Sequence, residues 1–142
     1  NICSFAKIMR TSYNPNQSPR IIIIQKLYGN FFNDDKHITF SKHRFKKFIK
    51  DVVLGTIERN EIITAEVKNH LSEDLQLTNL DKVFQIIVKS AIFELLYKPN
   101  VPTKIIIKEY LDASNFFLED GQTKYLNAIL DKIAKKIRNE NA

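Results

Sequence analysis

Side chains that could carry out catalysis or bind a metal ion are few in this sequence and lie far apart. The three histidines share no i, i+4 spacing, so no pair of them is predicted to bind one metal ion: they are His37, His43 and His70. Pairs of adjacent acids fall at expected helix ends or breaks, where carboxylates favour helix N-termini: Asp34-Asp35, Glu73-Asp74 and Glu119-Asp120. No Ser–His–Asp, phosphate-loop or dinucleotide pattern is present. We therefore predict no catalytic residue, no metal and no cofactor.

Composition favours a helical domain that folds without disulfides. The 142 residues include only 3 Gly and 4 Pro, whereas sheet proteins use many of both in their turns. Cys3 is the single cysteine, which excludes an intrachain disulfide and a cysteine-based zinc site built by this chain alone. No window reaches the ~18 apolar residues needed to span a bilayer, and the opening stretch does not resemble a secretory signal. We expect a cytoplasmic protein without membrane contact.

Positive charge is concentrated in the first third of the chain. Residues 1–50 contain ten Lys or Arg and two acids, whereas residues 51–142 contain twelve Lys or Arg and fourteen acids. An asymmetry of this kind is typical of an edge that binds a polyanion such as a nucleic acid. A solvated basic face without a ligand is the alternative, and the charge count alone leaves both open.

Six stretches have helical periodicity and follow a basic, polar arm at residues 1–18. Met9 is the only methionine, so either translation begins there or residues 1–8 belong to the protein. Apolar spacing predicts helices over residues 20–32, 41–60, 61–77, 79–98, 103–118 and 122–138. Ser41 is expected to cap the second helix, Thr78 or Asn79 the fourth, and Pro99 to end the fourth. These patterns predict an all-α domain of six or seven helices over residues 19–142.

Three segments resemble the NusB family. Residues 91–97 (AIFELLY) end a helix in aromatic-Glu-Leu, and a Val-Pro turn at 101–102 then opens a helix containing Ile107-Lys108-Glu109, where the family has Ile-Asn-Glu. Residues 124–132 (KYLNAILDK) are similar to the family's Lys-Phe-Val-Asn-(Gly/Ala)-Val-Leu-Asp-Lys. Arg20 followed by Gln25, Leu27 and Tyr28 is similar to the family's first helix. The resemblance covers roughly residues 18–138 and is most specific in the C-terminal half.

The resemblance implies a fold, a function and partners. The fold would be two packed three-helix bundles. The function would be transcription antitermination without catalysis: the protein pairs with the ribosomal protein NusE, the pair binds boxA RNA, and the complex helps RNA polymerase resist termination on ribosomal RNA operons. The protein would be a monomer or a homodimer, since the family includes both.

The resemblance also implies site residues. Those expected to bind RNA are Lys7, Arg10, Arg20, Gln25, Lys26, Lys124 and Tyr125; those expected to contact the protein partner are Tyr28, Asp81 and Phe84. The chain departs from the family in having only Arg20 at the matched end of an arginine run. Either the RNA affinity is lower than is usual in the family, or Lys26, Lys46 and Lys47 carry part of it. Tyr28 and Tyr125 are equally well explained as core residues.

Two other functions stay open at this stage. The single arginine at the matched position is compatible with a NusB-like module that binds proteins and has lost RNA binding. NusB-like domains also occur fused to ribosomal RNA cytosine methyltransferases, so the chain could be the N-terminal domain of such an enzyme. It has no glycine motif of the methyltransferase fold and is therefore not a complete methyltransferase.

Overall fold

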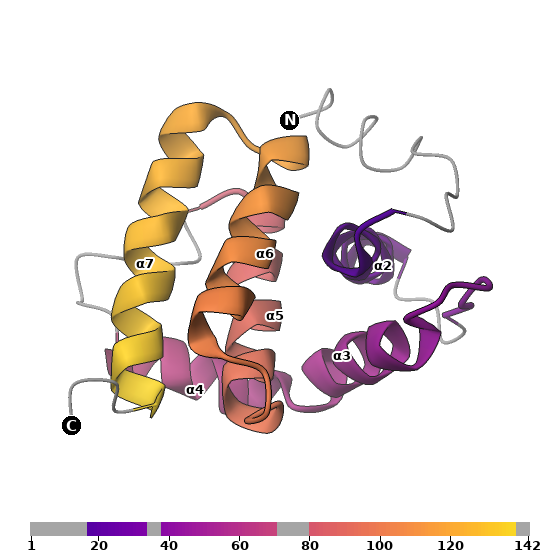
Figure 1. The fold of residues 1–142 in the computed structure, drawn as a ribbon, viewed down its shortest axis with the longest axis horizontal. Coiled ribbons are helices and arrows are strands. Elements are labelled where there is room, and N and C mark those ends of the chain that lie inside the picture. Colours follow the sequence, from indigo (N-terminus) through magenta and orange to yellow (C-terminus); the bar gives the residue numbers. More distant parts are fainter. Residues whose placement is uncertain (1–16, 34–37, 71–79, 139–142) are drawn as a thin grey trace.

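The protein is built from helices that surround one central helix. The computed structural model describes residues 17–33, 38–70 and 80–138 (Figure 1). Within these ranges the elements are α2 (Pro19–Asn33), α3 (Lys46–Glu58), α4 (Asn60–His70), α5 (Lys82–Tyr97), α6 (Thr103–Phe117) and α7 (Asp120–Arg138). The all-α prediction is confirmed for this part of the chain. The predicted arm, with Lys7 and Arg10, lies outside it except for its last two residues.

Helix α5 is the centre of the fold. It packs against all five of the other helices, and α6 and α7 lie beside it and beside each other (Figure 1). Its side chains are buried on nearly every face, as its apolar sequence predicts, because a helix that is hydrophobic all round must be covered all round. On the other side α2 and α3 pack against each other and against α5. The predicted two bundles therefore share α5 and one continuous core.

None of the helices described is both long enough and apolar enough to cross a membrane.

The start of α3 differs from the prediction. The helix begins at Lys46 rather than near residue 41, so Ser41 does not cap it; Phe45 occupies the N-cap position. The reason is His43, whose Nδ1 accepts a hydrogen bond from the Phe45 N–H at 2.9 Å, which leaves Nε2 to donate to the Gln17 carbonyl oxygen at 2.8 Å. These two bonds hold the segment before α3 in a non-helical conformation against the start of α2.

Two other helix starts also differ. Asp81 occupies the N-cap position of α5. The predicted caps, Thr78 and Asn79, lie outside the described residues. Helix α7 starts at Asp120, two residues earlier than expected, and the break before it falls at Leu118 and Glu119. Pro99 follows the end of α5, as predicted.

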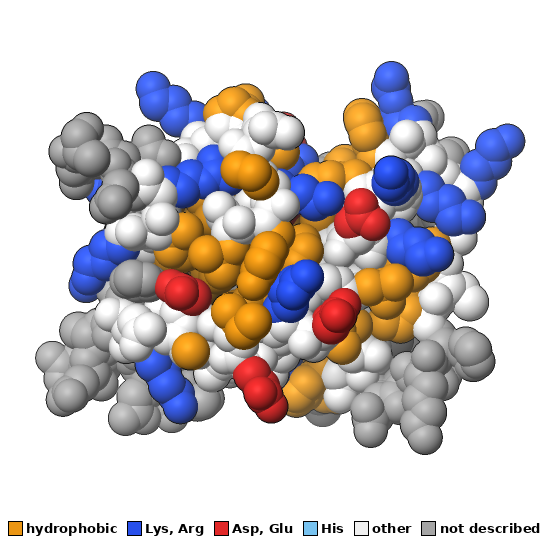
Figure 2. Space-filling view, turned by 90° about the horizontal axis from the view of Figure 1, so that it is seen from below, with side chains coloured by type: hydrophobic (Ala, Val, Ile, Leu, Met, Phe, Trp, Pro, Cys, Tyr) orange, Lys and Arg blue, Asp and Glu red, His pale blue; other side chains and the backbone are white. Residues whose placement is uncertain are grey.

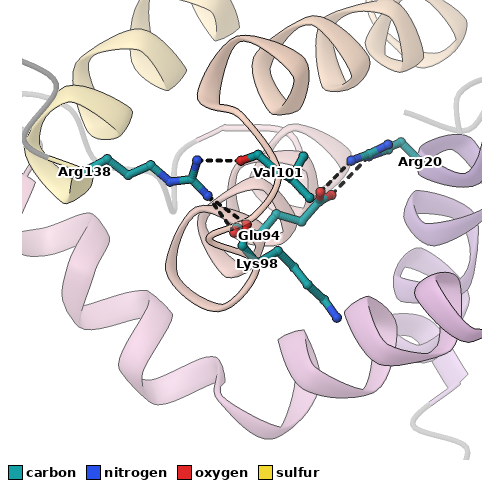
Figure 3. Close-up of polar contacts among 5 residues, drawn as sticks. All are labelled: Arg20, Glu94, Lys98, Val101 and Arg138. Atoms are coloured by element: carbon teal, nitrogen blue, oxygen red, sulfur yellow. Dashed lines mark hydrogen bonds and ion pairs between the residues drawn. The ribbon is translucent and has the colours of Figure 1, made fainter.

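Arg138 fixes the last turn of α7 to the end of α5. Its guanidinium donates to the carbonyl oxygens of Lys98 at 3.0 Å and Val101 at 2.6 Å (Figure 3). It also donates to the carbonyls of Glu94 and Leu95. The last carbonyls of a helix lack partners further along the helix, and Leu95 is in the last turn of α5. The guanidinium therefore satisfies one such carbonyl and joins it to carbonyls of the turn that follows the helix.

Candidate nucleic-acid interface

Five cations form a patch around the start of α3. This basic patch consists of Lys42, Arg44, Lys46, Lys47 and Lys50, and every one of these side chains is exposed. No acidic residue lies among them in the sequence, and none of the five forms an ion pair within the described ranges. Figure 2, which views the molecule from below, shows Lys and Arg side chains gathered at the right, on the side where α3 begins. The patch is therefore a surface of uncompensated positive charge.

The packing of α3 explains why these cations face solvent. Ile49, Val52 and Val53 are buried against α2 and α5, so they define the inner face of the helix. Lys47 falls on the opposite side of the same helix, and Lys46 in its first turn and Lys50 at the edge of the buried face are also exposed. The amphipathic sequence of residues 41–60 predicts this division, and the structure confirms it from Lys46 onward.

Aromatic rings lie within the basic patch. Phe45 is 46% exposed, and the Arg44 guanidinium lies 5.2 Å from the centre of its ring. The Nζ of Lys26 lies 6.0 Å from the centre of the Phe40 ring, which links α2 to the edge of the patch. Cations beside exposed aromatic rings are what single-stranded nucleic acids require, because phosphates pair with the cations and bases stack on the rings.

Neither Arg44 nor Phe45 is among the site residues predicted from the sequence. Helical spacing over residues 41–60 places Phe45 on the apolar face of the predicted helix, but the helix begins at Lys46 and Phe45 is exposed. The signal for this part of the patch is the density of charge, five cations in the nine residues 42–50.

Arg20 lies in the interior and is held by an ion pair. Its guanidinium bonds both carboxylate oxygens of Glu94, at 2.6 Å and 3.2 Å, and the two side chains are 10% and 0% exposed (Figure 3). The rings of Phe48 and Tyr110 lie 4.7 Å and 5.8 Å from the guanidinium carbon. Burial alone would lower the pKa of Arg20, but the hydrogen bond and charge of Glu94 outweigh it and raise this pKa, so Arg20 stays cationic. RNA binding by Arg20 would require this pair to open.

The other predicted RNA-binding residues of α2 are half-buried. Gln25 has a buried side-chain nitrogen with no hydrogen-bond partner among the described residues. Lys26 is half-buried beside Phe40.

Lys124 and Tyr125 lie apart from the basic patch, at the start of α7. Both are exposed, Tyr125 by 37%. Figure 1 shows α7 and α3 on opposite sides of α5 and α6. The predicted RNA-binding residues that the structure describes therefore do not form one surface. Lys26 lies beside Phe40 at the edge of the basic patch, whereas Tyr125 lies beside Phe84, one of the residues predicted to contact a protein.

The three residues predicted to contact a protein partner lie around the start of α5, where Asp81 and Phe84 are close in sequence and Tyr28 of α2 is near enough to be affected by the charge of Asp81. Phe84 is buried, and its ring centre lies 5.7 Å from that of Tyr125. Tyr28 is also buried; its burial and the nearby charge of Asp81 raise the pKa of its hydroxyl. Asp81 is exposed and accepts a hydrogen bond from Gln122 at 3.1 Å. Asp81 and Tyr125 are thus the parts of this group that a partner can touch from solvent.

No group of three or more His, Cys, Asp or Glu side chains that could hold a metal ion occurs among the described residues.

Comparison with known proteins identifies the family. The family model described as "NusB family" matches residues 16–135. Among named relatives, the transcription antitermination protein NusB of Rickettsia bellii is 36% identical over 118 residues, covering 79% of this chain and 73% of that protein. The proteins of that name from Mesorhizobium japonicum and Rhizobium etli are 28% and 33% identical over 94 and 96 residues, covering 66% and 68% of this chain. Of these two relatives the chain spans only 61% and 58%.

The fold is also known from a solved structure. The structure titled T. maritima NusB has a TM-score of 0.74 to this one, at 22% identity, covering 88% of this chain and 94% of that chain. Because the family model matches most of the sequence, the chain belongs to the NusB family.

Proposed function

We propose that this protein is a non-catalytic transcription antitermination factor that acts in the cytoplasm. With the ribosomal protein NusE it would bind boxA RNA and help RNA polymerase resist termination on ribosomal RNA operons. Membership of the NusB family and the name shared by its relatives support antitermination. The observation that carries the RNA-binding part is the basic patch, five exposed cations around the start of α3 that pair with no acid in the part of the chain that the structure describes.

Electrostatics would supply most of the RNA affinity. Each phosphate that a patch cation neutralises releases condensed counterions, so the affinity falls as salt rises. If all five cations contact a single strand, the slope of log K against log salt is about −3.5. The exposed ring of Phe45 would stack on a base, and stacking adds roughly 1–3 kcal/mol for each base.

NusE would dock around the start of α5. Asp81 offers an exposed carboxylate to a basic ribosomal protein, and Tyr125 offers a partly exposed ring beside it. A docked partner that also touches the RNA would join two weak contacts into one stronger complex. Lys124 and Tyr125 would then reach RNA that extends across both proteins.

Fluorescence anisotropy of labelled boxA RNA tests this proposal. The K46Q/K47Q variant is expected to bind more weakly than the wild type at low salt, with a salt slope shallower by about 1.4. The control K104Q/K132Q removes two exposed lysines outside the patch and is expected to behave like the wild type. Absence of RNA binding at low salt, even with NusE present, would refute the proposal. If the two double variants weakened RNA binding equally, the basic patch would not be the RNA-binding surface.

A second function, a protein-interaction module without RNA binding, is favoured by one observation. Arg20, the one arginine at the matched end of the family's run, is engaged by Glu94. For such a module, NusE captured on a resin would retain the protein independently of salt, while labelled RNA would show no change in anisotropy with or without NusE.

A further inference from the structure

A groove separate from the basic patch lies between α2, α5 and the junction of α3 with α4. Its volume is about 310 Å³. The lining residues are Leu27, Asn30, Phe31, Thr56, Ile57, Asn60, Lys82, Ile86 and Lys89. Buried Leu27, Thr56 and Ile86 form its floor, whereas Phe31 and Ile57 are 51% and 37% exposed and form its rim. The groove is thus apolar along its middle and open to solvent.

Two lysines give this groove a positive charge that no acid in its lining offsets. Lys82 and Lys89 both project from α5, and within the described residues neither forms an ion pair. The Nζ of Lys82 lies 3.7 Å from the centre of the Phe31 ring, and the Nζ of Lys89 donates to the Asn60 side-chain oxygen at 3.1 Å. Burial lowers the pKa of both lysines, and the charge of Lys89 lowers that of Lys82 further. A carboxylate entering the groove would relieve this unfavourable arrangement.

Thr56 is an independent sign of a missing partner. Its side chain is 5% exposed and lines the groove, and its hydroxyl has no hydrogen-bond partner among the described residues. A buried hydroxyl without a partner costs roughly 1–3 kcal/mol, so native structures rarely leave one unsatisfied. The oxygen is covered by its neighbours, so a polar ligand atom would satisfy it once the side chains that cover it move aside.

The spacing of the lysines indicates the form of the ligand. Lys82 and Lys89 are seven residues apart on α5, which places them about 10 Å apart along the helix axis with Ile86 between them. In an extended peptide successive side chains point to opposite sides, so two side chains that flank an apolar side chain on the same side are four residues apart and about 13 Å from each other, a span that flexible lysine side chains can meet. We propose that this groove binds an acidic segment of a protein partner, extended, with two carboxylates four residues apart and an apolar side chain midway between them on the same side. A nucleic acid fits less well, because its charged backbone would lie over an apolar floor.

The isolated chain and a synthetic peptide are sufficient to test this inference, which does not depend on RNA or NusE. The probe is acetyl-Ser-Glu-Ser-Leu-Ser-Glu-Ser-amide, titrated into ¹⁵N-labelled protein, and the control peptide has Gln in place of both Glu. We expect saturable shifts of the backbone amides around the groove with the acidic peptide only. In K82Q/K89Q the affinity should fall about tenfold or more, and in K132Q it should stay unchanged.

Thr56→Val separates a binding role from a merely structural one. Removal of an unsatisfied hydroxyl is expected to raise Tm, and under this proposal it also weakens binding of the acidic peptide. A higher Tm with unchanged peptide affinity would remove Thr56 from the site.

Any one of four results would overturn the proposal. Equal binding of the two peptides, or an unchanged affinity of K82Q/K89Q, would show that charge does not select the ligand. An oligouridylate that shifts the groove amides when the peptide does not would assign the groove to nucleic acid. Glu73 and Asp74 precede α5 and lie outside the described residues; if E73Q/D74N alone shifts the groove amides, the chain's own acidic segment is the occupant.

Discussion

The ion pair between Arg20 and Glu94 leads to the sharpest prediction about stability. Glu94→Gln keeps the shape of the side chain and a hydrogen-bond acceptor but removes the negative charge. The Arg20 guanidinium, 10% exposed, would then be left buried without a counter-charge. Removing one partner of a buried pair costs about 3–5 kcal/mol. For a chain of this length that loss corresponds to a fall in Tm of roughly 10–15 °C.

Thermal unfolding followed by circular dichroism at 222 nm, with urea unfolding as a second measurement, gives the free energy of unfolding for each variant. The matched control is Asp112→Asn, which breaks the pair between Lys108 and Asp112. Those side chains are 67% and 60% exposed, and solvent-exposed pairs contribute little, so no measurable change in Tm is expected.

A double variant distinguishes loss of the pair from loss of packing. Arg20→Met with Glu94→Leu removes both charges while keeping the volume apolar, so it should be more stable than Glu94→Gln alone. The reasoning would be refuted if Glu94→Gln matched Asp112→Asn, or if the double variant were no more stable than the single one.

Three further predictions concern other contacts. Gly55→Ala should destabilise the fold because a Cβ there would overlap the Phe93 ring, whereas Gly29→Ala, with open space around it, should stabilise α2 by roughly 0.5–1 kcal/mol. Urea unfolding measures the free energy of unfolding of both variants. If the two substitutions changed it in the same direction, the packing of α3 on α5 would be contradicted. Arg138→Lys should lower the free energy of unfolding by about 1–2 kcal/mol, because an ammonium cannot reach all the carbonyls that the guanidinium joins. An unchanged midpoint of urea unfolding would mean that water replaces the hydrogen bonds of the guanidinium. Burial, together with the nearby Glu94 carboxylate, raises the pKa of the Tyr110 hydroxyl. The folded state therefore keeps a proton that the unfolded chain releases above about pH 10. The free energy of unfolding should fall as the pH rises past about 10, and it should fall less steeply in Tyr110→Phe.

Local pattern in the sequence was enough to predict most of the fold. The periodicity of apolar residues located all six described helices, and the continuous apolar character of residues 83–96 predicted the central position of α5. The ends of helices were less predictable, because they depend on single polar contacts. His43 delays the start of α3 through a bond to Gln17, 26 residues away in the sequence.

The surface was predictable only where charge is dense in the sequence. Lys46, Lys47 and Lys50 are exposed because α3 buries its apolar face, and Lys42 and Arg44 are exposed in the turn before it, so the basic patch follows from the dense charge of residues 42–50. Arg20 has the same charge but a different environment, which depends on Glu94, 74 residues further along the chain. Likewise, only the packing of α2, α3 and α5 places Thr56 beside Lys82 and Lys89. Periodicity records which side of a helix is apolar, but helix packing alone decides which polar groups meet, and therefore which cation is buried and which is exposed.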